Sequence, residues 1–305
     1  MISVAMATYN GEKYLKEQLL SIISQTQKPD EIVINDDCST DGTEEVVKEV
    51  SLLTEIPIFY ERNERQLGFA ENFRRAIRRT KGDIIFLSDQ DDIWLCHKIE
   101  LSVSVLEKRN DILALSTGFV FFHDKGVPAM PLGISDKEEA QEPVRVLWEQ
   151  FIRHPKYPGM AMVFRRSLWP KIDAMVWGER FAHDWMINQY AASVGGMYQI
   201  GNKTVLYRQH ENNTEGVIIN RSKKTVRSKR EKIILALIDE MEAIHPLEQE
   251  RAAFLVQAIQ FQKERCSLLH QGKLMKLFLY EIHNLQYITL RSIMGDIYVC
   301  LKSAR

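Results

Sequence analysis

The sequence predicts an α/β fold with a mostly parallel sheet flanked by helices, followed by a helical C-terminal appendage. Three observations predict it. Strand-like and helix-like patterns alternate over the first 95 residues, polar acidic segments follow two of the strand-like runs at 36–43 and 89–92, and residues beyond 216 have an almost wholly helical pattern. Alternating strands and helices produce parallel strands, whose ligands bind at the carboxyl ends of the strands.

The first four predicted strands are short apolar runs, each bounded by polar residues or glycine. They cover residues 2–7, 31–35, 58–61 and 84–87. Helices are predicted between them at 12–27, 44–53 and 68–80, where apolar residues recur on one helical face. Pro29 ends the first of these helices, and Gly82 follows the third.

The second part of the chain has a less regular pattern. We expect a helix at 94–110, an antiparallel hairpin strand at 113–123, a surface loop at 127–143 and a helix at 144–153. A strand at 160–165, a helix at 185–193 and a strand beginning at 205 follow. A basic linker at 216–232 then leads to a helical region at 233–305.

Composition and charge narrow the class of protein. The net charge of −1, with 27% charged residues, argues against a dedicated nucleic-acid binder. The four cysteines, Cys38, Cys96, Cys266 and Cys300, form no CxxC pair, which is typical of reduced thiols in a cytosolic protein. The N-terminus has no signal-peptide pattern and no run approaches 18 apolar residues, so we expect a cytoplasmic location.

Three carboxylates lie within four residues directly after the strand at 84–87. In an extended chain, Asp89 and Asp91 point to the same side, so their oxygens can converge on one hard cation, whereas Asp92 points the other way. Mg²⁺ or Mn²⁺ fits such oxygen ligands. The alternative is an acidic turn that caps the helix beginning near Trp94. Because the acidic segment at 36–37 also ends a strand, the metal interpretation is favoured.

Four consecutive motifs carry a family resemblance. The segments ISVAMATYNGEKYL, EIVINDDCSTDGT, GFAENFRRAI and KGDIIFLSDQDDIW, in this order and spacing, resemble the family 2 inverting glycosyltransferases with a GT-A fold. SDQDDIW, with HDW and YRQHENN downstream, is most similar to the bacterial branch that includes rhamnosyltransferases. The resemblance covers Met1 to Asn213. It implies a catalytic domain at 1–215, with a nucleotide-binding half at 1–100 and an acceptor half at 101–215.

The resemblance implies an activity and a set of substrates. A sugar would move from a nucleotide-diphosphate donor, dTDP-rhamnose or a UDP-sugar, to a hydroxyl of a growing cell-surface polysaccharide or a lipid-linked oligosaccharide. By resemblance, Asp91 is the metal ligand, Asp89 supports the metal or the ribose, and His210 approaches the metal or the diphosphate. A structural histidine is an equal alternative for His210.

The chemistry of a nucleotide donor points to residues that would hold the nucleotide. A pyrimidine needs an acceptor for its N3–H, and Asp36 at the end of the second strand can provide it, with Asp37 as the next choice. Thr8 and Asn10, at the end of the first strand, would frame the nucleotide. Arg208 and Asn212 are weaker candidates for phosphate contacts.

Inversion at the anomeric carbon requires one general base opposite the leaving diphosphate. Asp184, in the segment Arg180–Trp185, matches the family's catalytic-base position. The alternative is a helix N-cap aspartate. Two other functions stay open: a phosphatase of the haloacid dehalogenase type, because of the strand followed by DQDD, and a catalytically idle protein that binds membrane or nucleic acid through its basic segment.

The C-terminal region mixes apolar and basic residues. Residues 220–232 are rich in Lys and Arg, and residues 273–302 combine Leu, Phe, Tyr and Ile with Lys and Arg. Peripheral contact with the inner face of the cell membrane is one hypothesis. Packing against the catalytic domain or in a homodimer is the other, and it is favoured because Glu281 and Asp296 interrupt the basic pattern.

Overall fold

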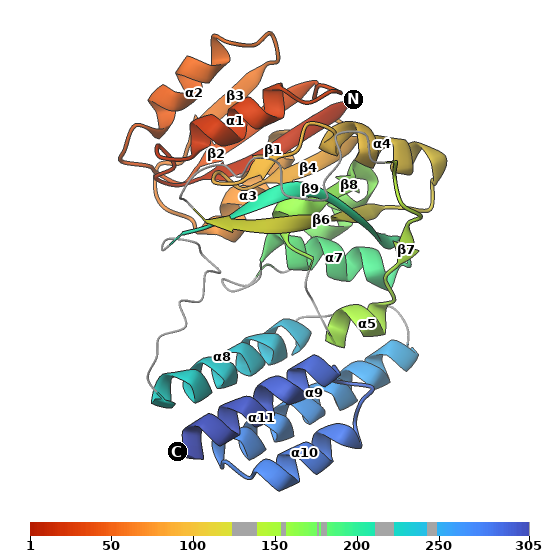
Figure 1. Cartoon of the computed structure of the whole chain (residues 1–305). Coiled ribbons are helices and arrows are strands. Elements are labelled where there is room, and N and C mark those ends of the chain that lie inside the picture. Colours follow the sequence, from red (N-terminus) through yellow and green to blue (C-terminus); the bar gives the residue numbers. More distant parts are fainter. Residues whose placement is uncertain are drawn as a thin grey trace. The chain divides into compact units, whose positions relative to one another are not determined.

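The computed structural model describes residues 1–123, 139–153, 157–175, 177, 182–210, 223–242 and 249–304. The chain divides into two compact units. Unit 1 comprises Met1–Leu147 and Tyr157–Gly216, and unit 2 comprises Trp148–Lys156 and Val217–Arg305 (Figure 1). Each unit has a hydrophobic core of its own.

Unit 1 is built on one sheet of nine strands, counted over the described residues, with helices packed against it (Figure 1). This arrangement confirms the predicted α/β class. The strand order is β3-β2-β1-β4-β8-β6-β9-β5, and β7 pairs with β9 outside this path. The strands are β1 (Ile2–Thr8), β2 (Glu31–Asp36), β3 (Ile58–Arg62), β4 (Ile84–Ser88), β5 (Ile93–Trp94), β6 (Ala114–His123), β7 (Val144–Arg145), β8 (Met162–Arg165) and β9 (Met197–Gln209).

The first four strands form the fully parallel part of the sheet. β1 lies between β2 and β4, with Val4 opposite Ile32 on one side and Phe86 on the other. Both faces of these central strands are covered, which explains why their residues are apolar without alternation. The covering helices of this half are α1 (Leu15–Ile23), α2 (Thr43–Ser51) and α3 (Phe69–Arg79).

The remaining strands form a mixed extension. β8 is antiparallel to both β4 and β6, while β6 and β9 are parallel to each other. The strand predicted at 113–123 is therefore present, and it has one antiparallel and one parallel neighbour. The helices and 3₁₀ turns of this half are α4 (Lys98–Lys108), η1 (Gly159–Ala161), η2 (Arg166–Leu168), α6 (Trp169–Asp173) and α7 (His183–Ser193).

Two predicted helices differ from the structure. The helix expected from Trp94 begins at Lys98, because Ile93 and Trp94 form β5, which pairs with β9. The helix expected at 144–153 is divided into the short strand β7 and α5 (Trp148–Arg153). Residues of β5 and β7 pair with β9 through backbone hydrogen bonds, and this pairing replaces the hydrogen bonds of the predicted helices. Residues 124–138, which include most of the predicted loop, lie outside the described part of the chain.

Unit 2 contains α5 and the long C-terminal helices. These are α8 (Lys223–Glu242), α9 (Gln249–His270), α10 (Leu274–Ile282) and α11 (Leu290–Ala304). Because α8 begins at Lys223, residues 223–232 of the expected basic linker are helical. The core of this unit gathers apolar side chains from all four helices: Ile234, Ile238, Leu268, Leu269, Leu277, Val299 and Cys300.

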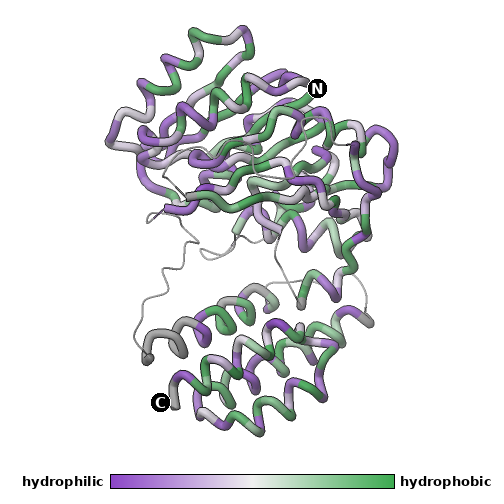
Figure 2. Tube along the Cα trace, in the orientation of Figure 1, coloured by the Kyte–Doolittle hydropathy of each residue, from purple (hydrophilic) through white to green (hydrophobic). Residues whose placement is uncertain are grey.

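Figure 2 shows hydrophobic and hydrophilic positions interspersed along the coloured parts of these helices. Among the helices described, none is long and apolar enough to cross a bilayer. All four cysteines fall in described segments, and none of them forms a disulfide.

Candidate active site

The carboxyl ends of β1, β2, β4 and β9 lie at one edge of the sheet. The first three strands are parallel neighbours. β8 runs antiparallel to β4 and to β6, and β9 runs parallel to β6, so β9 points the same way as β4. The polar segments that follow these strands therefore converge, as the sequence predicted for the acidic segments.

The acidic turn after β4 is joined directly to the end of β9. The Nε2 atom of His210 lies 2.8 Å from Oδ2 of Asp91, and the two side chains are only 11% and 14% exposed. The His210 ring also stacks on Tyr14, with ring centroids 4.8 Å apart. The structure thus brings together two of the three predicted metal ligands. Asp89, the third, follows Ser88 at the end of β4 in the same turn.

The side chain of Asp92 is buried, and it holds the strand end that carries His210 close to Asp91. Its Oδ1 accepts a hydrogen bond of 3.1 Å from the backbone N–H of Arg208, two residues before His210. Its Oδ2 is buried without a hydrogen-bond partner. Burial raises the pKa of Asp92 well above its usual range, and the nearby charges of Asp89 and Asp91 raise it further. The negative charge that a cation would offset in this turn therefore comes from Asp89 and Asp91.

Arg208 is a structural residue in this conformation. Its Nε donates to the backbone oxygen of Asp91 at 2.8 Å, and its guanidinium pairs with Glu17 and lies 4.6 Å from the ring centroids of Tyr14 and Phe122. The side chain is 5% exposed. These contacts fix β9 against the acidic turn, and the phosphate contact of Arg208 stays a prediction. Asn212, the other weak candidate, lies outside the described residues.

The described residues suit part of a metal site. No group of three His, Cys, Asp or Glu side chains within them is arranged to enclose a metal by itself. Asp91 and His210 offer one carboxylate oxygen and one imidazole nitrogen within reach of a common ion. Mg²⁺ and Mn²⁺ accept such partial protein shells when substrate phosphates and water supply the other ligands. The donor set therefore fits a cation held jointly by the protein and a diphosphate.

Thr8 and Asp36 form a buried pair between the ends of β1 and β2. Thr8 Oγ1 donates to Asp36 Oδ1 at 2.9 Å, and the Ser39 backbone N–H donates to Asp36 Oδ2 at 2.9 Å. The Ser39 hydroxyl also bonds to Asp36. Asp36 is fully buried. Asn10 has a φ of 47°, and its Oδ1 accepts the backbone N–H of Thr40 at 2.9 Å, so it joins the loops after β1 and β2.

Asp37 organises the loop before α3. Its Oδ1 accepts hydrogen bonds from the side-chain amide of Asn63 and the backbone N–H of Leu67, and its Oδ2 accepts one from the backbone N–H of Gly68, over 2.7–3.0 Å. Asp37 is 6% exposed. Neither Asp36 nor Asp37 thus presents its carboxylate openly to solvent.

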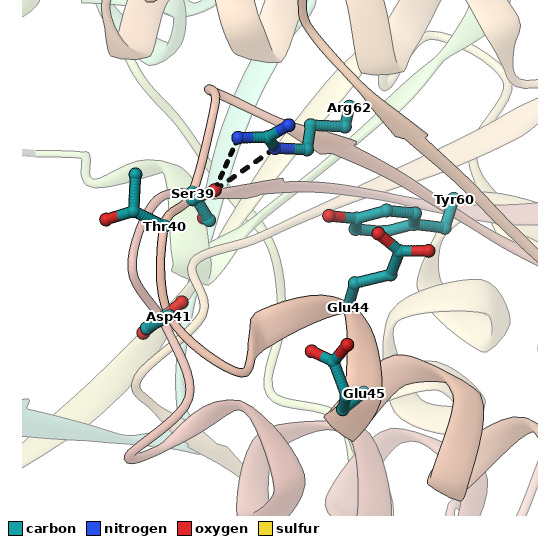
Figure 3. A pocket seen from close by; sticks show the side chains of 7 residues that line it. All are labelled: Ser39, Thr40, Asp41, Glu44, Glu45, Tyr60 and Arg62. Atoms are coloured by element: carbon teal, nitrogen blue, oxygen red, sulfur yellow. Dashed lines mark hydrogen bonds between the residues drawn. The ribbon is translucent and has the colours of Figure 1, made fainter.

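A pocket of about 250 Å³ opens beside the loop that follows β2 (Figure 3). Arg62 lies on its wall, and its Nη2 and Nε donate to the backbone oxygen of Ser39 at 2.8 and 3.1 Å. The Nε of Arg62 is 3.8 Å from Asp36 Oδ2. Burial, followed by the charge of Asp36, raises the pKa of Tyr60 on the pocket wall. The lining residues are Ser39, Thr40, Asp41, Glu44, Glu45, Tyr60 and Arg62.

Gln90 is a site residue that the sequence reasoning missed. Its Oε1 accepts the backbone N–H of Tyr9 at 2.9 Å, and its Nε2 donates to the backbone oxygen of Tyr9 at 3.0 Å. A Cβ on Gly11 would come within 2.4 Å of Gln90 Oε1, so a larger residue at this position would displace the Gln90 amide. The clamp fixes the acidic turn to the loop after β1 and leaves Tyr9 45% exposed. Only the position of Gln90 between two aspartates could have suggested it.

Asp184, on α7, lies at the same edge of the sheet. Its Oδ2 accepts the backbone N–H of Gly159 at 2.9 Å, and its Oδ1 accepts the backbone N–H of Trp185 at 2.7 Å. Gly159 precedes β8, whose N-terminal end lies beside the carboxyl end of β4 because those strands are antiparallel. Ala182 is the N-cap residue of α7, so Asp184 lies in the first turn of the helix and not at its cap.

His183, the neighbour of Asp184, is a buried packing residue. Its ring stacks on Phe73 with centroids 3.6 Å apart, and neither ring nitrogen has a hydrogen-bond partner. Burial lowers the pKa of His183 to about 3. The ring therefore stays neutral at physiological pH and anchors the start of α7 to α3. Arg180 and Phe181, in the same sequence segment, lie outside the described residues.

Comparison with known proteins decides the family. Residues 3–170, more than half of the chain, match the model of Glycosyl transferase family 2. The chain is a family 2 glycosyltransferase. It is 31% identical over 226 residues to the dTDP-rhamnosyl transferase RfbG of Shigella flexneri, a match that covers 70% of this chain and 75% of that protein. This family membership replaces the phosphatase alternative.

The fold agrees with this family. The structure of S. aureus TarS 1-349 in complex with UDP-GlcNAc aligns with a TM-score of 0.62 at 18% identity, over 98% of this chain and 81% of that one. The mannosyltransferase PcManGT from Pyrobaculum calidifontis, in complex with GDP-Man and Mn²⁺, aligns with a TM-score of 0.57 at 16% identity, over 99% and 86%. Further sequence relatives match over 33–60% of their own lengths.

Proposed function

We propose that this glycosyltransferase moves a sugar from a nucleotide-diphosphate donor to an acceptor hydroxyl with inversion, using one divalent metal and one aspartate base. The contact between Asp91 and His210 supports this proposal, because both side chains have atoms that can bind a metal and both lie at the strand ends that would hold a nucleotide. The likeness to a dTDP-rhamnosyl transferase and to structures named with UDP-GlcNAc and GDP-Man supports such a donor.

Asp91 and His210 would hold Mg²⁺ or Mn²⁺, and Asp89 would support the metal or the ribose. When bound, the ion offsets the negative charge that builds up on the departing diphosphate. The protein's part is to position these ligands. Asp92 fixes the backbone two residues before His210, and Arg208 fixes the backbone of Asp91. The structural neighbour with Mn²⁺ supports a divalent metal here.

Asp184 would act as the general base. An inverting transfer needs one carboxylate to accept the proton of the attacking hydroxyl as that oxygen bonds to the anomeric carbon. The two backbone bonds from Gly159 and Trp185 hold the Asp184 carboxylate in one orientation. This arrangement supports a base that is preorganised at the sheet edge.

The donor nucleotide would lie along the ends of β1 and β2. Thr8 and Asn10 would frame it, and the exposed ring of Tyr9 offers a surface on which a base could stack. Asp36 would accept the pyrimidine N3–H, with Asp37 supporting the loop. Because Asp36 is buried and bonded to Thr8 and Ser39, this contact requires the loop after β2 to rearrange. The donor would be dTDP-rhamnose or a UDP-sugar.

The acceptor would be a growing cell-surface polysaccharide or a lipid-linked oligosaccharide, as the family resemblance implies. An acceptor of the second kind is held at a membrane. We therefore propose that the C-terminal region contacts the membrane surface. The alternative role of this region is to form a homodimer.

A thermal-shift screen tests the donor site. The protein is heated with Mn²⁺ or Mg²⁺ in the presence of dTDP, UDP or GDP and the corresponding sugars, with and without chelator. We expect pyrimidine nucleoside diphosphates to raise the melting temperature only when the metal is present, because ligands that bind the folded state stabilise it. A preference for GDP would contradict the role of Asp36. The absence of a shift with every nucleotide would contradict the proposed donor site.

A further inference from the structure

The α10–α11 hairpin presents an uncovered apolar stripe on each of its helices. On α11, Leu290, Met294, Tyr298 and Leu301 follow helical spacing and are 54–66% exposed. On α10, Met275, Leu279 and Ile282 do the same, at 37–68% exposed. The opposite sides of both helices contribute Leu277, Val299 and Cys300 to the core of unit 2. These exposed residues are therefore additional to those that hold the unit together.

The basic residues of the hairpin lie on its surface, and its acidic residues lie in the interior. Basic side chains accompany the exposed stripes: Lys273, Lys276 and Arg291 are exposed and Lys302 is partly exposed. Over residues 271–304 the sequence contains two acidic residues, Glu281 and Asp296, and both side chains are fully buried. The outward surface of the hairpin thus carries apolar groups and positive charge without an exposed carboxylate.

Arginines from neighbouring helices pair with both acids: Arg265 is buried, and Arg230 is partly buried. Arg265 of α9 lies 2.7 Å from Asp296 and 3.1 Å from Glu281, and Arg230 of α8 lies 2.5 Å from Asp296. Burial, with Asp296 next, raises the pKa of Glu281 to about 9, so this carboxyl adds no charge at neutral pH. The two acids that interrupt the basic pattern in the sequence are therefore interior residues. They do not weaken the positive surface.

We propose that the α10–α11 hairpin docks on the surface of an anionic lipid bilayer. Exposed Leu, Met, Ile and Tyr side chains would enter the boundary between headgroups and acyl chains, while Lys273, Lys276, Arg291 and Lys302 would face anionic headgroups. Charge complementarity favours this occupant over a second copy of the chain, because two such surfaces would bring positive charges together. The proposal deepens the membrane contact of the proposed function, but lipid binding is measured without catalysis, so the two can fail separately.

Vesicle co-sedimentation with the full chain tests the proposal. We expect binding to vesicles that contain phosphatidylglycerol, much weaker binding to pure phosphatidylcholine, and a decrease as salt is raised. The double variant K276E/R291E should bind anionic vesicles at least tenfold more weakly, because each basic residue near such a surface contributes about a fivefold factor. The control K28E, at an exposed lysine of unit 1, should bind like the parent.

A second pair of variants tests the apolar part. L290Q/M294Q should reduce vesicle binding, whereas V256Q, at a residue that is 67% exposed on α9, should not. Circular dichroism and melting curves establish that each variant is folded, which is expected because the substituted side chains are exposed. Absence of binding to anionic vesicles at low salt would overturn the proposal. So would a concentration-dependent dimer, seen by light scattering, that L290Q/M294Q converts to monomer without any change in lipid binding.

Discussion

The Nε2 atom of His210 lies 2.8 Å from Oδ2 of Asp91, although 119 residues separate them in the chain. The sheet creates this contact, because β4 and β9 end at the same edge. Two hydrogen bonds, from the Arg208 backbone to Asp92 and from the Arg208 side chain to the Asp91 backbone, then hold the two strand ends together. A carboxylate and an imidazole brought together in this way, in a turn that carries two further aspartates, form a donor set that suits a cation.

Replacement of the proposed base separates chemistry from binding. We expect Asp184→Asn to lower kcat by about 10²–10⁴-fold, because the variant cannot accept the acceptor's proton. The affinity for the donor should stay within about twofold, since Asn can still accept one of the two backbone bonds. Initial rates and donor titrations measure the two effects. Asp111→Asn, at an exposed carboxylate, is the control, and an unchanged kcat in Asp184→Asn would show that Asp184 is structural only.

Asp37 is predicted to matter for stability. Its carboxylate accepts three hydrogen bonds from Asn63, Leu67 and Gly68 and is nearly buried. Asp37→Ala leaves the N–H groups of Leu67 and Gly68 without this partner, whereas the Asn63 amide keeps its bond to Asn72. We therefore expect a loss of about 2–4 kcal/mol in the free energy of unfolding. Denaturant titration measures it, with Asp41→Ala, a partly exposed residue of the same loop, as the comparison. A loss below about 0.5 kcal/mol would mean that water replaces the carboxylate.

The buried ring of His183 predicts a pH dependence of stability. The folded chain keeps this ring neutral down to about pH 3, whereas the unfolded chain binds a proton near pH 6.5. Its contribution to stability is therefore fully present above pH 6.5 and is lost as the pH falls towards 3. His183→Phe should flatten the fall in melting temperature between pH 6.5 and 4. It should not reduce stability at pH 7, because both ring nitrogens lack partners.

The exposed His270 provides the matched control for this experiment. His270→Gln should keep the parent's pH profile, since its side chain is 78% exposed. Equal slopes in the parent and in His183→Phe would show that the acid sensitivity arises elsewhere.

The parallel half of the sheet was predictable because its signal is local. The strands β1 to β4 are apolar runs separated by amphipathic helices, and a run such as Ile84–Leu87 carries its own evidence of burial. The alternation also predicted that the acidic segments would share one edge. The family resemblance then added His210 and Asp184, whose positions no local pattern could have fixed.

The missed features depend on long-range contacts. β5 has two residues, Ile93 and Trp94, and is a strand only because β9 lies beside it. Gln90 acts through the backbone of Tyr9, 81 positions away. The sequence also shows that Glu281 and Asp296 interrupt a basic pattern, but not that Arg265 and Arg230 bind them in the interior. Such pairings follow from tertiary packing.

Calorimetric titration of a nucleoside diphosphate, with and without Mn²⁺, into the parent, Asp91→Ala and His210→Ala tests the central claim most directly. Mn²⁺ should increase the affinity of the parent for dTDP or UDP at least tenfold. It should have no effect in Asp91→Ala and a reduced effect in His210→Ala, because these side chains supply the protein's share of the metal ligands. The same metal dependence in all three proteins would contradict the assignment of Asp91 and His210 as the metal site.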